Sequence, residues 1–132
     1  MKKYIFVVSL LCLLAACTGK RQGEAAVEIA ALPAVEDVVM YQVNPRVFAP
    51  EKSFKAVERR LDSIQALGIN VVWFMPINEV GQEKSVNSPY CVKDYKGVNP
   101  EFGTLDEFKA LVATCHQKGM NVIIDWVANH TS

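Results

Sequence analysis

The chain has 132 residues, 51% of them hydrophobic, and its 14 basic and 14 acidic side chains cancel at neutral pH. A domain of ordinary size takes about 100–200 residues, so this length holds one domain at most. Hydrophobic and aromatic residues occur along the whole chain, which argues against a disordered tail. The zero net charge gives no basis for binding to nucleic acid.

The first 16 residues have the pattern of an export signal. Lys2 and Lys3 give a positive start, and residues 4–16 form an apolar run broken only by Ser9. A membrane span takes about 20 residues, so this run predicts a secretory signal peptide over 1–16 instead. The run ends in LAAC, which resembles a bacterial lipobox and makes Cys17 the predicted lipidation site. The alternative is an ordinary signal followed by an unrelated cysteine.

These features predict a protein that is exported and anchored by a lipid to the bacterial cell envelope, at the outer membrane or the periplasmic face. Residues 17–34 are small, polar and rich in alanine, which is typical of a tether, so the folded part is expected over 35–132. That part holds Cys91 and Cys115. Two cysteines make no disulfide framework, and no CxxC or Cys/His cluster indicates zinc, so we expect free, buried thiols.

Three apolar runs, over 38–43, 71–74 and 122–124, predict strands. Each run is continuous rather than alternating, which is typical of strands buried on both faces of a parallel sheet. The connection over 75–103 is long and rich in Pro, Gly, Asn, Ser and Tyr. Loops of that length in a compact domain are usually functional or disordered.

Two helices are predicted between these strands. Apolar residues at helical spacing over 54–67 indicate the first helix, with Ser53 as its N-cap and Gly68 at its end. The second helix begins after Thr104, which forms a capping box with Glu107. The order is then strand, helix, strand, helix, strand, and right-handed crossovers place the three strands in one parallel sheet.

Four segments carry a resemblance to a known family. Residues 125–130 read DWVANH, an aspartate and a three-residue spacer before Asn-His, directly after the third predicted strand. Residues 90–95 read YCVKDY and residues 99–104 read NPEFGT, while residues 41–48 begin Tyr-Gln and end Arg-Val-Phe. In this order and spacing the segments resemble the first part of the alpha-amylase family, glycoside hydrolase family 13.

The resemblance implies an α/β fold, a partial (β/α)8 TIM barrel with the first three parallel strands and two helices. In such barrels the loops after the strands carry the active site. The family cleaves alpha-linked glucans with retention, using two carboxylates about 5–5.5 Å apart. In the family these carboxylates follow the fourth and fifth strands, and a further aspartate follows the seventh.

This sequence ends just past the third strand, whereas a complete barrel takes about 250 residues. The resemblance therefore implies the N-terminal part of a longer enzyme, without catalytic residues among 1–132 and without activity on its own. Three acids in or beside the long connection, Glu79, Glu83 and Asp94, match no catalytic position of the family.

Four residues take site roles from the resemblance. Tyr90 matches a tyrosine that stacks on the sugar at the cleavage point, and His130 matches a histidine that hydrogen-bonds hydroxyls of that sugar. Asp125 matches a buried aspartate that orients neighbouring polar groups. Asn129 matches an asparagine that ligates a structural calcium in many members. Each also has a plainer interpretation, namely surface packing for Tyr90, a structural role for His130, a turn cap for Asp125 and a turn residue without metal for Asn129.

The two tryptophans, Trp73 and Trp126, lie in or beside predicted strands, so we expect them to pack in the core or barrel rather than to bind sugar.

The predicted function is that of a glycosidase acting on alpha-glucans such as starch or maltooligosaccharides. Its expected partners are the glucan and, through the lipid, a membrane, and its only candidate cofactor is calcium. One alternative is a transglycosylase or isomerase of the same family. The other is a non-catalytic lipoprotein that binds glucan.

Overall fold

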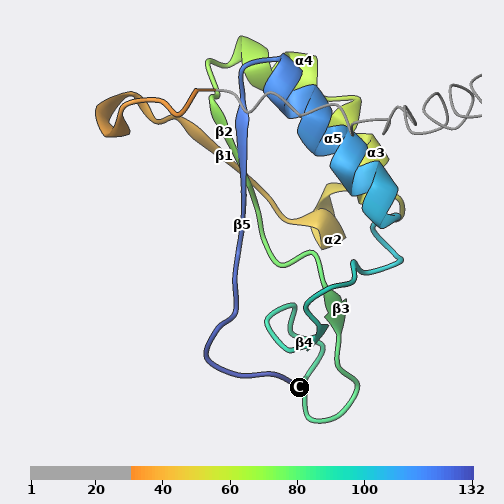
Figure 1. The fold of residues 1–132 in the computed structure, drawn as a ribbon. Coiled ribbons are helices and arrows are strands. Elements are labelled where there is room, and N and C mark those ends of the chain that lie inside the picture. Colours follow the sequence, from red (N-terminus) through yellow and green to blue (C-terminus); the bar gives the residue numbers. More distant parts are fainter. Residues whose placement is uncertain (1–30) are drawn as a thin grey trace, which may run out of the picture.

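The computed structural model describes residues 31–132, which are coloured by sequence position in Figure 1. The predicted signal peptide over 1–16, the predicted lipidation site Cys17 and most of the predicted tether lie outside the described residues. Within residues 31–132, no helix is both long and apolar enough to span a membrane.

Three parallel strands form the main sheet, in the order β1 (Met40–Val43), β2 (Val71–Phe74) and β5 (Asn121–Ile124). All three predicted strands and their parallel arrangement are confirmed. The second strand has the predicted bounds, whereas β1 begins two residues later and β5 one residue earlier than predicted. The central strand β2 is buried at three of its four residues, because it has a neighbour on either side.

Helices α3 (Ser53–Glu58), α4 (Leu61–Ala66) and α5 (Leu105–Gln117) cover one face of this sheet (Figure 1). The sequence predicted a single helix over 54–67, and this prediction is wrong at its middle. A turn at Arg59 and Arg60 separates α3 from α4, and the Arg60 amide donates to the Val57 carbonyl at 2.8 Å. Both short helices still bury their apolar positions in the core.

The predicted N-cap role of Ser53 is also wrong. The residue before α3 is Lys52, which has a left-handed backbone (φ 49°) and makes no capping hydrogen bond through its side chain. Ser53 is buried, and its hydroxyl donates to the Pro45 carbonyl at 2.5 Å. A buried hydroxyl needs a partner, and the carbonyl of the preceding short helix α2 (Pro45–Phe48) supplies it.

The start of α5 confirms the predicted capping box. The Glu107 amide donates to Thr104 Oγ1 at 3.1 Å, and the Thr104 amide donates to Glu107 Oε2 at 2.9 Å. Two amides that the first helical turn leaves without a partner are satisfied in this way. The box therefore fixes where the long connection ends and α5 begins.

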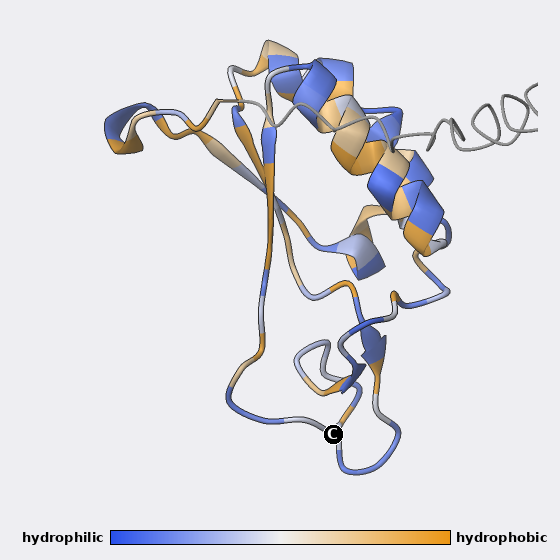
Figure 2. Cartoon of the chain, in the orientation of Figure 1, coloured by the Kyte–Doolittle hydropathy of each residue, from blue (hydrophilic) through white to orange (hydrophobic). Residues whose placement is uncertain are grey.

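The core lies between the helices and the sheet. Three aromatic rings join the layers: the centroids of Phe54 and Phe108 are 4.9 Å apart, and those of Phe74 and Phe108 are 5.5 Å apart. Figure 2 shows strands that are mainly hydrophobic, whereas α5 mixes hydrophobic and hydrophilic residues. The apolar stripe of α5 thus faces the sheet, and its polar residues face away.

Both cysteines of the described part are free, as predicted. Cys115 is fully buried on α5, and this burial, with a smaller effect from the negative charge of Glu58, raises the pKa of its thiol to about 12. Cys91 is only half-buried, so the prediction of burial is wrong for this residue. It lies in the long connection, where its thiol donates to the Ser85 carbonyl at 3.6 Å.

The long connection after β2 has structure that the sequence did not predict. Its strands β3 (Glu79–Val80) and β4 (Val92–Asp94) pair antiparallel in a small second sheet. In Figure 1 this sheet lies beyond the carboxyl ends of the three parallel strands, beside the last residues of the described chain. The Ser132 amide donates to the Val92 carbonyl at 3.2 Å, which ties the segment after β5 to β4.

The capping box generates a stability prediction. Replacing Thr104 with alanine removes the acceptor for the Glu107 amide, and loss of such a cap costs about 0.5–2 kcal/mol. Urea unfolding should therefore show a lower midpoint for Thr104→Ala. Thr131→Ala is the matched control, because Thr131 is exposed and lies outside any helix. Equal midpoints for the two variants would contradict the role of the cap.

Candidate functional site

Polar residues gather at the carboxyl edge of the parallel sheet, where β5 leads into residues 125–132. The Asp125 amide donates to the Phe74 carbonyl at 2.9 Å, so the backbone pairing of β5 with β2 continues one residue past the strand. The position of Asp125 is therefore set by the sheet rather than by a free loop.

The carboxylate of Asp125 accepts two hydrogen bonds from side chains far away in sequence. The indole Nε1 of Trp73 donates to Oδ1 at 2.6 Å, and the phenol of Tyr90 donates to Oδ2 at 2.8 Å. Trp73 lies on β2, and Tyr90 lies in the long connection just before β4. The structure thus brings together two of the predicted site residues, Tyr90 and Asp125, and adds Trp73 to them.

Tyr90 remains partly open to solvent, with 38% of its surface exposed. Its pKa is raised above the ordinary value, first because its hydroxyl donates to Asp125, and then because of partial burial and the negative charge of that carboxylate. The phenol therefore stays protonated, and stays a hydrogen-bond donor, across the neutral pH range.

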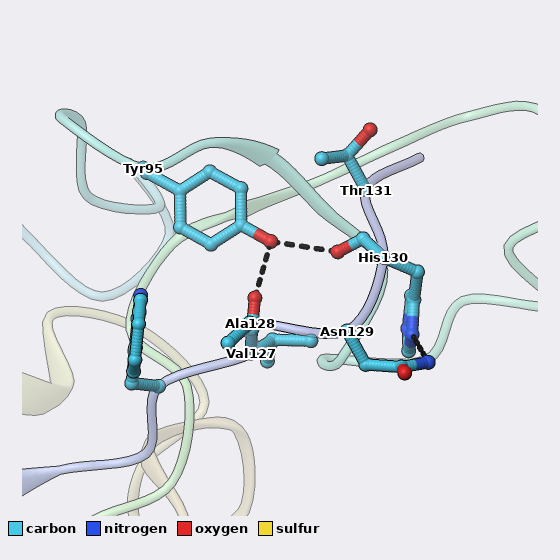
Figure 3. A pocket seen from close by; sticks show the side chains of 7 residues that line it. Tyr95, Val127, Ala128, Asn129, His130 and Thr131 are labelled. Carbon is cyan, nitrogen blue, oxygen red and sulfur yellow. Dashed lines mark hydrogen bonds between the residues drawn. The ribbon is translucent and has the colours of Figure 1, made fainter.

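The residues that follow Asp125 line a pocket of about 400 Å³ (Figure 3). Its wall consists of one tyrosine from the long connection and the residues that follow Asp125: Tyr95, Trp126, Val127, Ala128, Asn129, His130 and Thr131. The Tyr95 hydroxyl lies 2.6 Å from the Val127 carbonyl and 2.7 Å from the His130 carbonyl. It has one proton to share between these two acceptors, and so it holds the backbone of this turn.

The predicted residue His130 lies in the wall of this pocket, with an exposed side chain. Its Nδ1 is 3.2 Å from Nδ2 of Asn129, and its ring makes no hydrogen bond with Tyr90 or Asp125. A dashed line in Figure 3 marks the contact with Asn129. The structure therefore places His130 in a set of contacts separate from that of Tyr90 and Asp125.

The calcium prediction at Asn129 stays a prediction. The described residues contain no group of three or more His, Cys, Asp or Glu side chains that could hold a metal. Calcium takes six to eight oxygen ligands, and Asn129 offers one amide oxygen.

The packing prediction has a different outcome for each of the two tryptophans. Trp126 is 81% exposed, so its prediction as a core residue is wrong. It follows the last residue of the β5 pairing, at the edge strand, where the described chain places no element over it. Trp73 is half-buried, and in addition to packing it makes the hydrogen bond to Asp125.

Tyr95 is a site residue that the sequence analysis did not single out. It ends the YCVKDY segment whose first residue is Tyr90, and this spacing was the only available signal for it. Both tyrosines use their hydroxyls to hold the chain after β5, Tyr90 at Asp125 and Tyr95 at the turn that includes His130.

Comparison with known proteins decides the family. The family model described as "Alpha amylase, catalytic domain" matches residues 51–132. The chain belongs to the alpha-amylase family. A crystal structure of an alpha-amylase from Lactobacillus plantarum has 42% sequence identity, covers 73% of this chain and aligns with a TM-score of 0.67. The match includes the three-stranded parallel sheet, so the fold is a partial TIM barrel of the alpha-amylase kind.

Relatives in this family carry different names. The human protein named amino acid transporter heavy chain SLC3A1 is 39% identical over 98 residues, which cover 70% of this chain. The Bacillus subtilis protein named probable oligo-1,6-glucosidase 2 is 34% identical over 102 residues, which cover 74% of this chain. The chain spans 14% and 18% of the length of these two relatives, and 24% of the Lactobacillus plantarum alpha-amylase.

The contact between Tyr90 and Asp125 is testable by titration. The hydrogen bond from the protonated phenol to the carboxylate stabilises the folded protein. This stabilisation is fully present below a pH of about 10, the pKa of an ordinary tyrosine, and is lost as the pH rises through the raised pKa of the folded state. In Asp125→Asn, we expect the pKa of Tyr90 to fall toward its ordinary value. Ultraviolet absorbance of the ionised phenol measures it, with Tyr90→Phe identifying the signal. An unchanged pKa in Asp125→Asn would show that the contact is absent in solution.

Proposed function

We propose that the chain forms part of the catalytic barrel of a retaining glycosidase that acts on alpha-glucans such as starch or maltooligosaccharides. The observation that carries this proposal is the hydrogen-bonded pair of Tyr90 and Asp125 at the carboxyl edge of an alpha-amylase sheet. In TIM-barrel enzymes this edge holds the active site.

The chemistry of the pair suits a sugar. A glucosyl ring has an apolar face, and the partly exposed ring of Tyr90 offers an aromatic surface to it. An ionised carboxylate has about four acceptor positions, of which Trp73 and Tyr90 occupy two on Asp125. The remaining positions can accept sugar hydroxyls, so Asp125 both holds Tyr90 and recognises the substrate in this proposal.

His130 and the adjoining pocket extend the proposed subsite. Its lining mixes an indole, a phenol, an imidazole and backbone carbonyls, a combination that matches the mixed apolar and hydroxyl surface of a sugar. Hydrogen bonds from such groups speed the reaction only as far as they strengthen in the oxocarbenium-like transition state.

The two catalytic carboxylates are proposed to come from residues beyond 132. Two acids of the long connection have other partners: Glu79 pairs with Lys93 at 2.7 Å, and Asp94 accepts from the Lys96 amide at 2.8 Å. Glu83 is exposed in the loop between β3 and β4. Residues 1–132 alone should therefore have no hydrolase activity.

Two further proposals concern attachment and metal. The LAAC sequence before residue 18 supports a lipid on Cys17 and anchoring of the protein to the bacterial cell envelope. Calcium at Asn129 is proposed with further oxygen ligands, since the described residues hold no group of three or more His, Cys, Asp or Glu side chains for it.

A binding role without catalysis is the second candidate. One relative at 39% identity is named a transporter heavy chain rather than a glycosidase. That name is a reason to weigh a role without catalysis. For this chain we propose, as the second candidate, a glucan-binding lipoprotein in which the same aromatic and hydroxyl contacts hold a sugar without cleaving it.

Assays of the full-length gene product separate the two candidates. We expect hydrolysis of maltooligosaccharides with retained anomeric configuration. Proton NMR measures the configuration of the product as it first forms. Tyr90→Ala should lower kcat/KM by an amount that corresponds to about 1–3 kcal/mol of activation free energy. The figure is taken by analogy from aromatic stacking on nucleic-acid bases. The control is Lys109→Ala on the exposed surface of α5.

Binding of maltooligosaccharides without any release of reducing sugar would reject the glycosidase in favour of the binding protein. Hydrolysis at the parent rate by Tyr90→Ala would leave the family assignment standing but would reject the proposed subsite.

A further inference from the structure

The strand register places Trp73 and Asp125 on the same face of the sheet. Trp73 on β2 pairs with Ile123 on β5, and Asp125 is two residues beyond Ile123. Side chains two residues apart on a strand point to the same face, so the Asp125 side chain is a diagonal neighbour of Trp73. A large side chain such as tryptophan reaches across that distance, and its Nε1 lies 2.6 Å from Oδ1 of Asp125.

This face is opposite to the one that the helices cover. Phe74, the next residue on β2, is fully buried in the core with α5, whereas Trp73 is half-buried and lies outside that core. A residue that only filled space here would need no polar atom. The indole N–H is a donor without acceptor capacity, and it is directed at a carboxylate.

An aspartate carboxylate can rotate easily about the bond that joins it to the rest of the side chain. Rotation about the terminal bond of an Asp side chain has a broad energy profile, so packing alone does not fix the plane of its two oxygens. In this structure each oxygen has its own donor, Trp73 on Oδ1 and Tyr90 on Oδ2. Within residues 31–132 no salt bridge includes Asp125, so the two neutral donors are what define its orientation.

The two donors differ in how firmly they are themselves held. Tyr90 lies in the long connection, where its neighbours include three non-glycine residues with positive φ, and its side chain is 38% exposed. Trp73 lies in the central strand, paired on both sides. Of the two donors to Asp125, the indole of Trp73 is therefore the more firmly held.

We propose that Trp73 is a positioning residue, whose indole N–H fixes the carboxylate of Asp125 so that its second oxygen receives the Tyr90 hydroxyl. Its effect on catalysis rests on the proposed glycosidase function, but its effect on Asp125 does not. Trp73 acts on the sugar through Asp125 and Tyr90.

The first test observes the indole directly in the full-length gene product labelled with 15N-tryptophan. Asp125→Asn replaces a charged acceptor with a neutral one and leaves Trp73 in place. We expect the proton resonance of the Trp73 indole to move upfield, because hydrogen bonds to charged groups are the stronger ones. The peak is the one missing from Trp73→Phe, and Trp126→Phe identifies the peak of the other tryptophan of the chain, which should move less.

The second test compares rates in two backgrounds. Trp73→Phe keeps an aromatic ring and removes the donor, and we expect it to lower kcat/KM on the order of tenfold in the parent. In an Asp125→Ala background the same substitution should cost less than about twofold, because mutations that act through one shared group are not additive. Lys109→Ala, on the exposed surface of α5, is the control in the parent background, and it should leave kcat/KM within about twofold.

The outcomes separate this proposal from the proposed function. An upfield shift without hydrolysis by the parent supports the positioning role and rejects the glycosidase. A Trp73 indole resonance that does not move in Asp125→Asn overturns the positioning role. Where Trp73→Phe does not fold, Trp73→Tyr identifies the peak instead. An equal rate loss from Trp73→Phe in both backgrounds also overturns it, because such a loss reflects packing alone.

Discussion

The candidate site depends on the backbone pairing of β5 with β2, because this pairing sets the position of Asp125. The amide of Asp125 continues the ladder to the Phe74 carbonyl, one residue beyond the last strand residue. Its side chain then lies on the face that also carries Trp73. A shift of one residue in this register would turn Asp125 to the helix-covered face and separate it from both of its donors.

The helices contribute to the site by holding that register. Phe108 on α5 contacts the ring of Phe74 on β2 and the ring of Phe54 on α3, so the helix layer packs against one face of the central strand. The Thr104 capping box fixes where α5 begins, and therefore where the long connection ends. That connection returns Tyr90 and Tyr95 to the edge of the sheet, where their hydroxyls hold the chain after β5.

The sequence predicted the features that depend on local pattern. Continuous apolar runs located the three strands, and the Thr104 box located the start of α5, because both signals arise within a few residues. The position of Ser53 was misinterpreted, since its hydroxyl meets a carbonyl eight residues away in the chain rather than its own helix. The turn at Arg59 and Arg60 had no glycine or proline to reveal it.

The site was predicted from family resemblance and not from pattern. The segments around Tyr90 and Asp125 identified these residues, but no local rule indicates that a phenol and a carboxylate 35 residues apart share a hydrogen bond. The role of Trp73 was inaccessible for the same reason, since it follows from the register of two strands. The exposure of Trp126 depends on which elements surround the edge strand, and sequence position near a strand does not report that.

A crystal structure of the full-length gene product with a bound maltooligosaccharide tests the central claim most directly. The account predicts a glucosyl ring stacked on Tyr90, with its hydroxyls donating to the Asp125 oxygens while the indole of Trp73 keeps its contact with the same carboxylate. A sugar bound away from this edge, or an Asp125 carboxylate that has turned away from both Trp73 and Tyr90 in the complex, would contradict the account.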